Sequence, residues 1–192
     1  MTRIVLLGPP GAGKGTQAAR LAQRLGVPAI STGDIFRRHT AEGTELGRAA
    51  QRYMDAGEYV PDEVTNGMVA DRLAQPDTAE GFLLDGYPRT AAQVDQLDAA
   101  LAAAGTALDA VLEITADTDE VVARLVRRAG EQGRADDTED VIRRRLEVYS
   151  RETAPLAARY ADRGLLVQVD GVGGVDEVEA RIAKALDERS GR

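Results

Sequence analysis

The sequence predicts an α/β fold, in which a parallel sheet of about five strands carries helices on both faces. Three observations lead to this expectation. Short apolar runs alternate with longer helical stretches along the chain. The first run, residues 4–7, is apolar at every position, as expected for a strand buried on both sides. The 192 residues, 43% of them hydrophobic, are also enough for one domain with a substantial core.

Five segments have the length and apolar character of buried strands. We place them at 4–7, 29–30, 81–86 (a strand and its turn), 110–114 and 165–169. Helical stretches separate all five segments. A helix that returns the chain to the start of the next strand makes the two strands parallel, and such a sheet is covered by helices on both faces.

The helices of the first half follow from their apolar faces and end signals. The stretch 15–25 places its leucines and several alanines on one face, and Gly26 ends it. Residues 34–54, interrupted near Gly43, and residues 62–73 are polar helical stretches. An alanine-rich helix is expected at 90–104.

Three further helices are expected in the second half. The first covers 117–128, with Asp117 as its N-cap. Residues 129–137 are charged, contain glycine and lack periodicity, so we expect a loop there. A long helix at 138–163 is expected to kink at Pro155, and an amphipathic helix follows at 176–189.

The composition argues against several classes of function. The chain has no cysteine, which removes disulfides, thiol catalysis and a cysteine-bound zinc site. Its formal net charge of -8 disfavours binding to long nucleic acids or to an anionic membrane. No apolar run is long enough to cross a bilayer, and four apolar residues before Gly8 are too few for a secretory signal. We therefore expect a cytoplasmic protein that binds neither nucleic acid nor membrane.

A glycine-rich loop at 8–16 carries the strongest functional signal. It reads Gly-Pro-Pro-Gly-Ala-Gly-Lys-Gly-Thr, follows the first strand and opens the first helix, as a phosphate-binding P-loop does. Glycines let backbone N–H groups surround phosphate oxygens, the helix N-terminus adds donors, and Lys14 adds a positive charge. The sequence thus predicts that ATP is bound by Gly11, Ala12, Gly13, Lys14, Gly15 and Thr16.

One position departs from the usual P-loop pattern. Gly15 stands directly after the lysine, where most P-loops have serine or threonine, and Thr16 comes one residue later. This order resembles the loop of the nucleoside monophosphate kinases. Further segments resemble adenylate kinases in order and spacing; they lie at 31–37, 85–93, 134–145 and 153–156.

The resemblance covers nearly the whole chain and implies how it is organised. A P-loop NTPase-type core would consist of 1–30, 61–126 and 138–192. A helical monophosphate-binding insertion would occupy 31–60. A short lid loop would occupy 127–137, and without cysteine it could not hold the zinc that some relatives bind.

The resemblance also implies two nucleotide sites that meet at the P-loop. The AMP set is Thr32, Arg37, Glu58, Tyr59, Val60, Gly86, Tyr87, Pro88, Arg89, Gln93, Arg134 and Arg145. For ATP the resemblance adds Arg124, which matches the arginine that stacks on adenine, Arg128, and a backbone contact at Gly173. The implied catalytic residues are Lys14, Arg89, Arg128, Arg134 and Arg145. We expect Arg127, Arg143 and Arg144 to lie on solvated faces.

Asp85 is the expected metal residue. It ends an apolar strand, as the carboxylate of a Walker B segment does. A carboxylate at that sheet edge can hold Mg²⁺ through water. For Asp136 and Asp137 two interpretations stay open: pairing with lid arginines, or a favourable charge at a helix N-terminus.

The resemblance implies an enzyme of the adenylate kinase family, which transfers the terminal phosphoryl group of ATP to AMP reversibly and with Mg²⁺, giving two ADP. Such an enzyme balances the adenine nucleotides, and its family suggests a monomer. Thr32 and Gln93 favour AMP, because the related UMP/CMP kinases usually carry Ala and Asn there. A UMP/CMP kinase and a P-loop NTPase that only hydrolyses remain alternatives, and the absence of an Asn-Lys-x-Asp motif disfavours the second.

Overall fold

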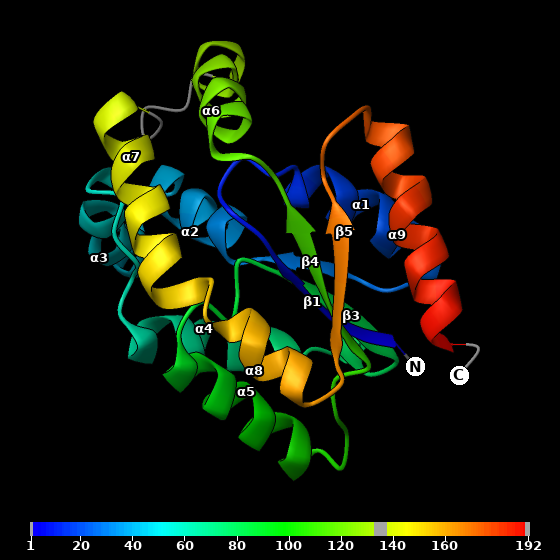
Figure 1. Cartoon of the computed structure of the whole chain (residues 1–192). Helices are drawn as coiled ribbons and strands as arrows, with labels where there is room; N and C mark the ends of the chain where they lie inside the picture. The colour runs from blue at the N-terminus through cyan, green and yellow to red at the C-terminus, as the bar shows by residue number, and fades with distance from the viewer. Residues whose placement is uncertain (1, 133–137, 191–192) are drawn as a thin grey trace.

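A computed structural model describes residues 2–132 and 138–190 and has the predicted α/β fold (Figure 1). Its five strands are β1 (Thr2–Leu7), β2 (Ala29–Ser31), β3 (Gly81–Asp85), β4 (Ala110–Thr115) and β5 (Leu166–Asp170). They form one sheet in the order β2-β3-β1-β4-β5, and all neighbouring strands are parallel. The predicted strands therefore exist, each within one or two residues of the expected bounds.

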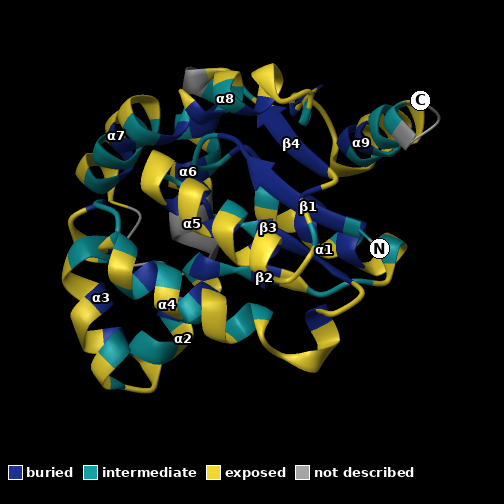
Figure 2. Cartoon of the chain, turned by 90° about the horizontal axis from the view of Figure 1, so that it is seen from below, coloured by how far each residue is buried: buried dark blue, intermediate teal, exposed yellow. Residues whose placement is uncertain are grey.

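Helices cover both faces of this sheet (Figure 1). Alternate residues of β1 point to opposite sides: Val5 and Leu7 join one core cluster, and Ile4 and Leu6 join the other. The first cluster is closed by α4 (Asp62–Leu73), α5 (Ala91–Ala103) and α8 (Leu156–Asp162). The second is closed by α1 (Lys14–Leu25) and α9 (Val175–Ser190). The three central strands β1, β3 and β4 are consequently the most buried part of the sheet (Figure 2).

The strand order creates a crevice at the carboxyl end of the sheet. The chain leaves β1 through α1 on one face and leaves β3 through α5 on the other. Because these neighbouring strands send their connections to opposite sides, a ligand can enter between them. Asp85 pairs with Leu6 of β1 and with Ser31 of β2, so three strand ends meet there.

The predicted insertion packs around a small hydrophobic cluster, which Val64 and Met68 of α4 also contact. It contains α2 (Thr32–Ala41) and α3 (Glu45–Asp55), which are separated at Gly43 as expected. Phe36, Ala50 and Val60 form the centre of this cluster. The hydroxyls of Ser31 and Thr44 cap the two helices by accepting hydrogen bonds from backbone N–H groups.

The predicted loop at 129–137 is wrong over its first residues. Helix α6 (Thr118–Gln132) does not end at Arg128 but continues four residues further. Alanine, glutamate and glutamine favour helix, and a single glycine costs only about 1 kcal/mol in a helix interior, so Gly130 does not stop it. Residues 133–137, with Arg134, Asp136 and Asp137, lie outside the described residues.

The long helix predicted at 138–163 is in fact three pieces. They are α7 (Glu139–Val148), a π-helical turn at Tyr149–Thr153, and α8. Proline lacks an N–H group and its ring clashes with the carbonyl four residues earlier, so the chain widens before Pro155. The Ala154 N–H bonds to the Tyr149 oxygen at 2.9 Å, five residues back. A 3-10 turn at Pro76–Thr78 was not predicted.

Candidate active site

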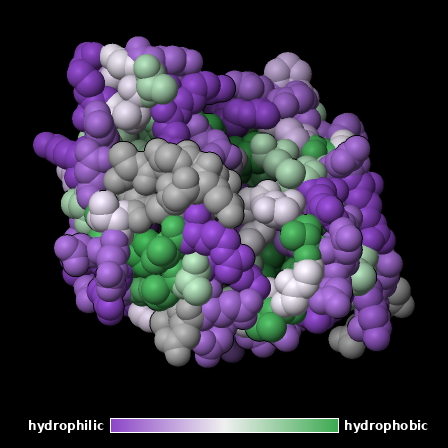
Figure 3. All heavy atoms as spheres, turned by 90° about the horizontal axis from the view of Figure 1, so that it is seen from above, coloured by the Kyte–Doolittle hydropathy of each residue, from purple (hydrophilic) through white to green (hydrophobic). Residues whose placement is uncertain are grey.

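A cavity of about 520 Å³ lies where the strand ends, the glycine loop and the insertion meet. Figure 3 views the molecule from this end, and hydrophilic side chains cover most of the surface seen there. The cavity is lined by residues of the 8–16 loop, α2, the 57–60 segment, the turn after β3, α6 and α7. The segments that the sequence analysis selected separately are therefore brought together.

The glycine loop wraps the start of α1. Gly13 has a φ of +90° at the N-cap of this helix, and Gly11 has a φ of +86°. Lys14 Nζ donates hydrogen bonds to the Gly8 and Pro9 carbonyl oxygens at 2.8 and 2.9 Å. The ammonium group thus lies over the loop, where a phosphate group would meet it together with the N–H groups at the helix start.

Asp85 faces this loop from the end of β3. A Cβ atom placed on Gly15 would lie 3.7 Å from Asp85 Oδ2. Asp85 and Thr16 both line the cavity. A carboxylate, whose oxygen atoms can bind a hydrated metal ion, therefore lies beside the position at which the loop would hold phosphates.

Gly86 holds Arg89 and Thr32 in place. Its carbonyl oxygen accepts hydrogen bonds from Arg89 Nε at 2.7 Å and from the Thr32 hydroxyl at 2.9 Å. Its φ is +80°, and a Cβ atom there would lie 2.8 Å from Thr32 Oγ1 and 2.9 Å from Arg89 Nη2. Only glycine fits this turn without displacing one of the two side chains.

Gln93 is buried at the start of α5, where one protein group binds its amide oxygen and another binds its amide nitrogen. Its Oε1 accepts from the Arg89 backbone N–H, and its Nε2 donates to an Asp62 oxygen, both at 2.7 Å. Thr90, the N-cap of α5, donates to the other Asp62 oxygen at 2.9 Å. The sequence analysis did not select Asp62, because nothing in its surroundings in the chain indicates a partner 31 residues away.

A second network reaches Arg89 from the π-helical turn. The Thr153 hydroxyl donates to the Arg89 carbonyl oxygen at 2.8 Å, and it lies 2.7 Å from the Tyr59 hydroxyl. Because the only Thr153 hydroxyl hydrogen is used on Arg89, Tyr59 is the donor to Thr153. The Arg89 guanidinium lies 4.9 Å from the centre of the Tyr59 ring, a cation–π contact.

Helix α7 also contacts the end of the insertion. Arg144 Nε donates to Glu58 Oε1 at 2.7 Å. A Cβ atom on Gly57 would lie 2.9 Å from the Val141 carbonyl oxygen. Arg144 is therefore more than the solvated residue that the sequence suggested, whereas Arg143 is 68% exposed and pairs with Glu139 on its own helix.

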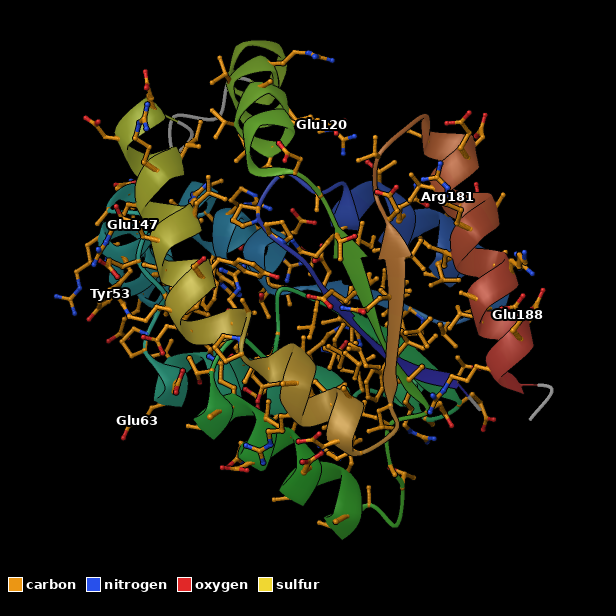
Figure 4. All side chains as sticks on the ribbon, viewed as in Figure 1. Tyr53, Glu63, Glu120, Glu147, Arg181 and Glu188 are labelled. Atoms are coloured by element: carbon orange, nitrogen blue, oxygen red, sulfur yellow. The ribbon has the colours of Figure 1, made fainter. Side chains whose placement is uncertain are left out.

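On the other side of the cavity, Arg124 of α6 pairs with Glu120 and donates to the Gly171 carbonyl oxygen at 3.2 Å. Arg181 of α9 donates to the Asp170 carbonyl oxygen at 2.9 Å. Figure 4 shows Glu120 and Arg181 on opposite sides of the loop that follows β5. This loop is thus held from both helices.

Most of the predicted site residues line the cavity. These are Gly11, Gly13, Lys14, Gly15, Thr16, Thr32, Arg37, Glu58, Tyr59, Val60, Asp85, Gly86, Pro88, Arg89, Gln93, Arg124 and Arg145. Three others do not line it. Ala12 is buried beneath the loop, the Tyr87 ring is in the core, and Gly173 lies beside Glu177. Arg128 belongs to α6, but its side chain is not described.

Cationic side chains predominate around this cavity. Lys14, Arg37, Arg89, Arg124 and Arg145 line it. Burial raises the pKa of the Tyr149 hydroxyl, with a further contribution from Glu113, so this cavity residue stays neutral at physiological pH. The arrangement suits a ligand with several negative charges, and no described histidine or cysteine lines it as a base or nucleophile.

Known proteins resemble this chain over nearly its whole length. The family model described as adenylate kinase matches residues 6–165. An adenylate kinase of Kocuria rhizophila is 64% identical over 187 residues, covering 97% of this chain and 100% of that protein. Adenylate kinases of Nocardioides sp. and Clavibacter michiganensis are 61% and 59% identical, over 96% and 100% of this chain and 97% and 96% of theirs. The chain therefore belongs to the adenylate kinase family.

Proposed function

We propose that this protein reversibly transfers the terminal phosphoryl group of ATP to AMP. The main support is the set of cationic residues that line the cavity. One cavity is lined both by the P-loop with Lys14 and by Arg37 and Arg89 from other segments. Two nucleotides bound to these two sets of groups would meet with their phosphates between the cations. Neutralising the phosphate charges lets one phosphate approach another.

The assignment of individual residues supports AMP as the acceptor. Arg37 and Arg89 would bind its phosphate, and Thr32 and Gln93 would face its base. Glu58, Tyr59 and Val60 would line the same half of the site. Arg124 and the P-loop would hold ATP, and Arg145, Arg128 and Arg134 would close over the transferring group.

Mg²⁺ is compatible with the residues present. Among the described residues no cluster of three or more His, Cys, Asp or Glu side chains could hold a metal alone. Mg²⁺ usually keeps several waters and binds through one or two carboxylates together with substrate phosphates. Asp85, next to Gly15, is such a carboxylate and would hold Mg²⁺ through water. When bound, Mg²⁺ would neutralise part of the charge on the transferring phosphate.

The chain's own residues would act by positioning rather than by proton transfer. The second pKa of a phosphate monoester is about 6, so AMP already carries a nucleophilic oxygen at neutral pH. Lys14 and the arginines would align this oxygen with the terminal phosphate of ATP and stabilise the charge that develops. Closure of the 31–60 insertion and of the 127–137 segment would exclude water, which would otherwise accept the phosphoryl group.

The decisive experiment is to incubate the purified protein with Mg²⁺ and ADP alone and to separate the nucleotides. Equal amounts of ATP and AMP are expected, because the reaction is reversible. Transfer to CMP or UMP with little transfer to AMP would favour a UMP/CMP kinase instead. Release of phosphate from ATP without an acceptor would favour a hydrolase and contradict the proposal.

We further propose that the enzyme works as a monomer in the cytoplasm and binds nucleotides with Mg²⁺, but neither nucleic acid nor membrane. The family resemblance supports the monomer, and the acidic net charge of -8 argues against nucleic-acid binding. None of the described helices has the length and apolarity needed to span a membrane. Light scattering during size-exclusion chromatography tests the monomer, with a mass near 20.4 kDa expected.

A further inference from the structure

The side-chain amide of Gln93 is held by two groups whose hydrogen-bonding roles cannot be exchanged. The Arg89 backbone N–H donates to Gln93 Oε1 at 2.7 Å, and Gln93 Nε2 donates to Asp62 Oδ1 at 2.7 Å. A backbone N–H can only donate, and an ionised carboxylate can only accept. The reversed amide would place oxygen against carboxylate and N–H against N–H. The partners therefore fix one orientation of the amide.

Asp62 is itself anchored in this arrangement. Its Oδ2 accepts from the Thr90 hydroxyl at 2.9 Å, and Thr90 Oγ1 accepts from the Gln93 backbone N–H at 3.2 Å. Asp62 lies in the first turn of α4, so the network joins α4 to the start of α5. Gln93 is only 1% exposed, so water has little access to replace either partner.

The fixed amide decides what a ligand can pair with. Two of the four hydrogen-bonding positions of the amide are used by protein, which leaves one N–H and one oxygen lone pair for the cavity that Gln93 lines. In a 6-aminopurine, ring nitrogen 1 accepts a hydrogen bond and the amino group on carbon 6 donates one. In a 6-oxopurine the roles are exchanged: the N–H at position 1 donates and the oxygen on carbon 6 accepts.

An aminopurine can thus form two hydrogen bonds with the amide in its fixed orientation. An oxopurine in the same pose would face oxygen with oxygen and N–H with N–H. A site whose buried polar groups are left unpaired by the wrong base rejects that base strongly. A freely reversible glutamine would lose this discrimination, because it could turn to match either base.

We propose that Asp62 is a positioning residue, which sets the orientation of the Gln93 amide and thereby the preference for 6-aminopurine over 6-oxopurine monophosphates. This inference rests on the proposed function, in which the base of the acceptor monophosphate reaches Gln93. Asp62 acts through Gln93 and does not need to touch the substrate.

The test compares AMP with IMP as acceptors in the Asp62→Asn variant. IMP is the sharper probe, because its base differs from adenine only at positions 1 and 6. Asparagine can present either an oxygen or an N–H group to Gln93, so the variant removes the constraint that the carboxylate imposes and leaves only the Arg89 N–H to oppose the reversed amide. The ratio of kcat/KM for AMP to that for IMP is expected to fall about tenfold, which corresponds to about 1.4 kcal/mol. Most of this change should appear in KM, since the contact is with the bound base.

Two controls separate this role from a structural one. Asp71→Asn changes an exposed carboxylate on the same helix and should leave the ratio at the wild-type value. In a Gln93→Ala background, Asp62→Asn should not change the ratio further, because its effect passes through the missing amide. If Asp62→Asn does not fold, Asp62→Ser is measured in the same way, since a hydroxyl can also donate or accept.

The outcomes distinguish failure of the proposed function from failure of the proposed role of Asp62. Wild-type enzyme that fails to phosphorylate AMP refutes the proposed function and the inference with it. Wild-type enzyme that prefers AMP, together with an Asp62 variant of unchanged AMP-to-IMP ratio, refutes the role of Asp62 alone. Equal losses on both acceptors, or a lower Tm with an unchanged ratio, likewise overturn it. If Asp62→Asn lowers the AMP-to-IMP ratio even in the Gln93→Ala background, Asp62 does not act through Gln93 and the proposed role is refuted.

Discussion

Replacing Gly86 by alanine is expected to damage the AMP half of the site more than the ATP half. The residue has a φ of +80°, which costs a non-glycine residue about 1–2 kcal/mol. The added Cβ would lie 2.8 Å from Thr32 Oγ1 and 2.9 Å from Arg89 Nη2. Thr32 is 2% exposed and has little room to move, so the Arg89 guanidinium is the group that shifts.

The magnitude follows from these two effects. Backbone strain and local repacking together are expected to lower the free energy of unfolding by about 2 kcal/mol. For a domain of this size that corresponds to a Tm lower by roughly 4–8 °C. Displacement of Arg89 is expected to raise the KM for AMP by about tenfold or more, whereas the KM for ATP should change little, because a loss of 1.4 kcal/mol of binding is tenfold.

The assay measures ADP formation with AMP or ATP varied, together with thermal unfolding of each variant. Two matched substitutions separate the causes. Gly26→Ala has a similar strain, with φ +67°, but its Cβ would have no neighbour within 4 Å. Gly67→Ala lies in a helix and also lacks a neighbour within 4 Å, so it should be neutral or stabilising. A Gly86→Ala enzyme with the wild-type KM for AMP and the Tm of Gly26→Ala would refute the reasoning.

Three further substitutions test other parts of the site and core. Lys14→Met should reduce phosphoryl transfer by at least about 100-fold without loss of the far-UV circular dichroism spectrum, because a preorganised charge is removed. Thr153→Val should lower the free energy of unfolding by about 1–3 kcal/mol in denaturant titrations, because the Arg89 carbonyl and Tyr59 hydroxyl each lose a partner. Tyr160→Phe should not destabilise the protein at pH 7, because the buried hydroxyl has no hydrogen-bond partner among the described residues. It should also reduce the loss of stability in alkali.

The sign of the last effect follows from the pKa of Tyr160, which burial raises above its usual value near 10. Below pH 10 both folded and unfolded states keep the proton, so stability is fully present. Above pH 10 the unfolded state loses the proton first, and stability falls as pH rises. An equally steep alkaline loss in Tyr160→Phe contradicts this account. Wild-type activity in Lys14→Met, or wild-type unfolding in Thr153→Val, contradicts the other two.

The fold could be predicted because its signals are local. Each strand is a short apolar run, and each of the first helices has an end signal such as Gly26 or a break such as Gly43. The end of α6 and the division of the helix predicted at 138–163 were predicted wrongly, because the signal in the sequence was weak or affected residues several positions away. The charged, aperiodic and glycine-containing stretch 129–137 predicts a loop, yet α6 continues to Gln132 because one glycine costs a helix little; Pro155 perturbs the chain from Tyr149 onward rather than only at its own position.

In the candidate site, too, the parts formed by contiguous residues could be predicted and the parts formed by distant residues could not. The glycine loop is contiguous, so its backbone geometry follows from its residues. The groups that orient Arg89 and Gln93 are not contiguous with them. Asp62 is 31 residues from Gln93, and Thr153 is 64 residues from Arg89. Nothing in the sequence near Asp62 or Thr153 indicates these hydrogen bonds, because they exist only once α4, α5 and the π-helical turn have packed together.

Arg144 bears on how the insertion can move relative to α7. Its contact with Glu58 joins the end of the insertion to α7, and the two side chains are 40% and 35% exposed. An ion pair in contact with solvent contributes little to stability and weakens with salt. The insertion packs internally around Phe36, Ala50 and Val60, and α4 of the main body packs against the same cluster through Val64 and Met68. A motion of the insertion relative to α7 that keeps its packing on α4 would break polar contacts, the exposed Arg144–Glu58 pair and the Tyr59–Thr153 hydrogen bond, and this is the property that closure over AMP would require.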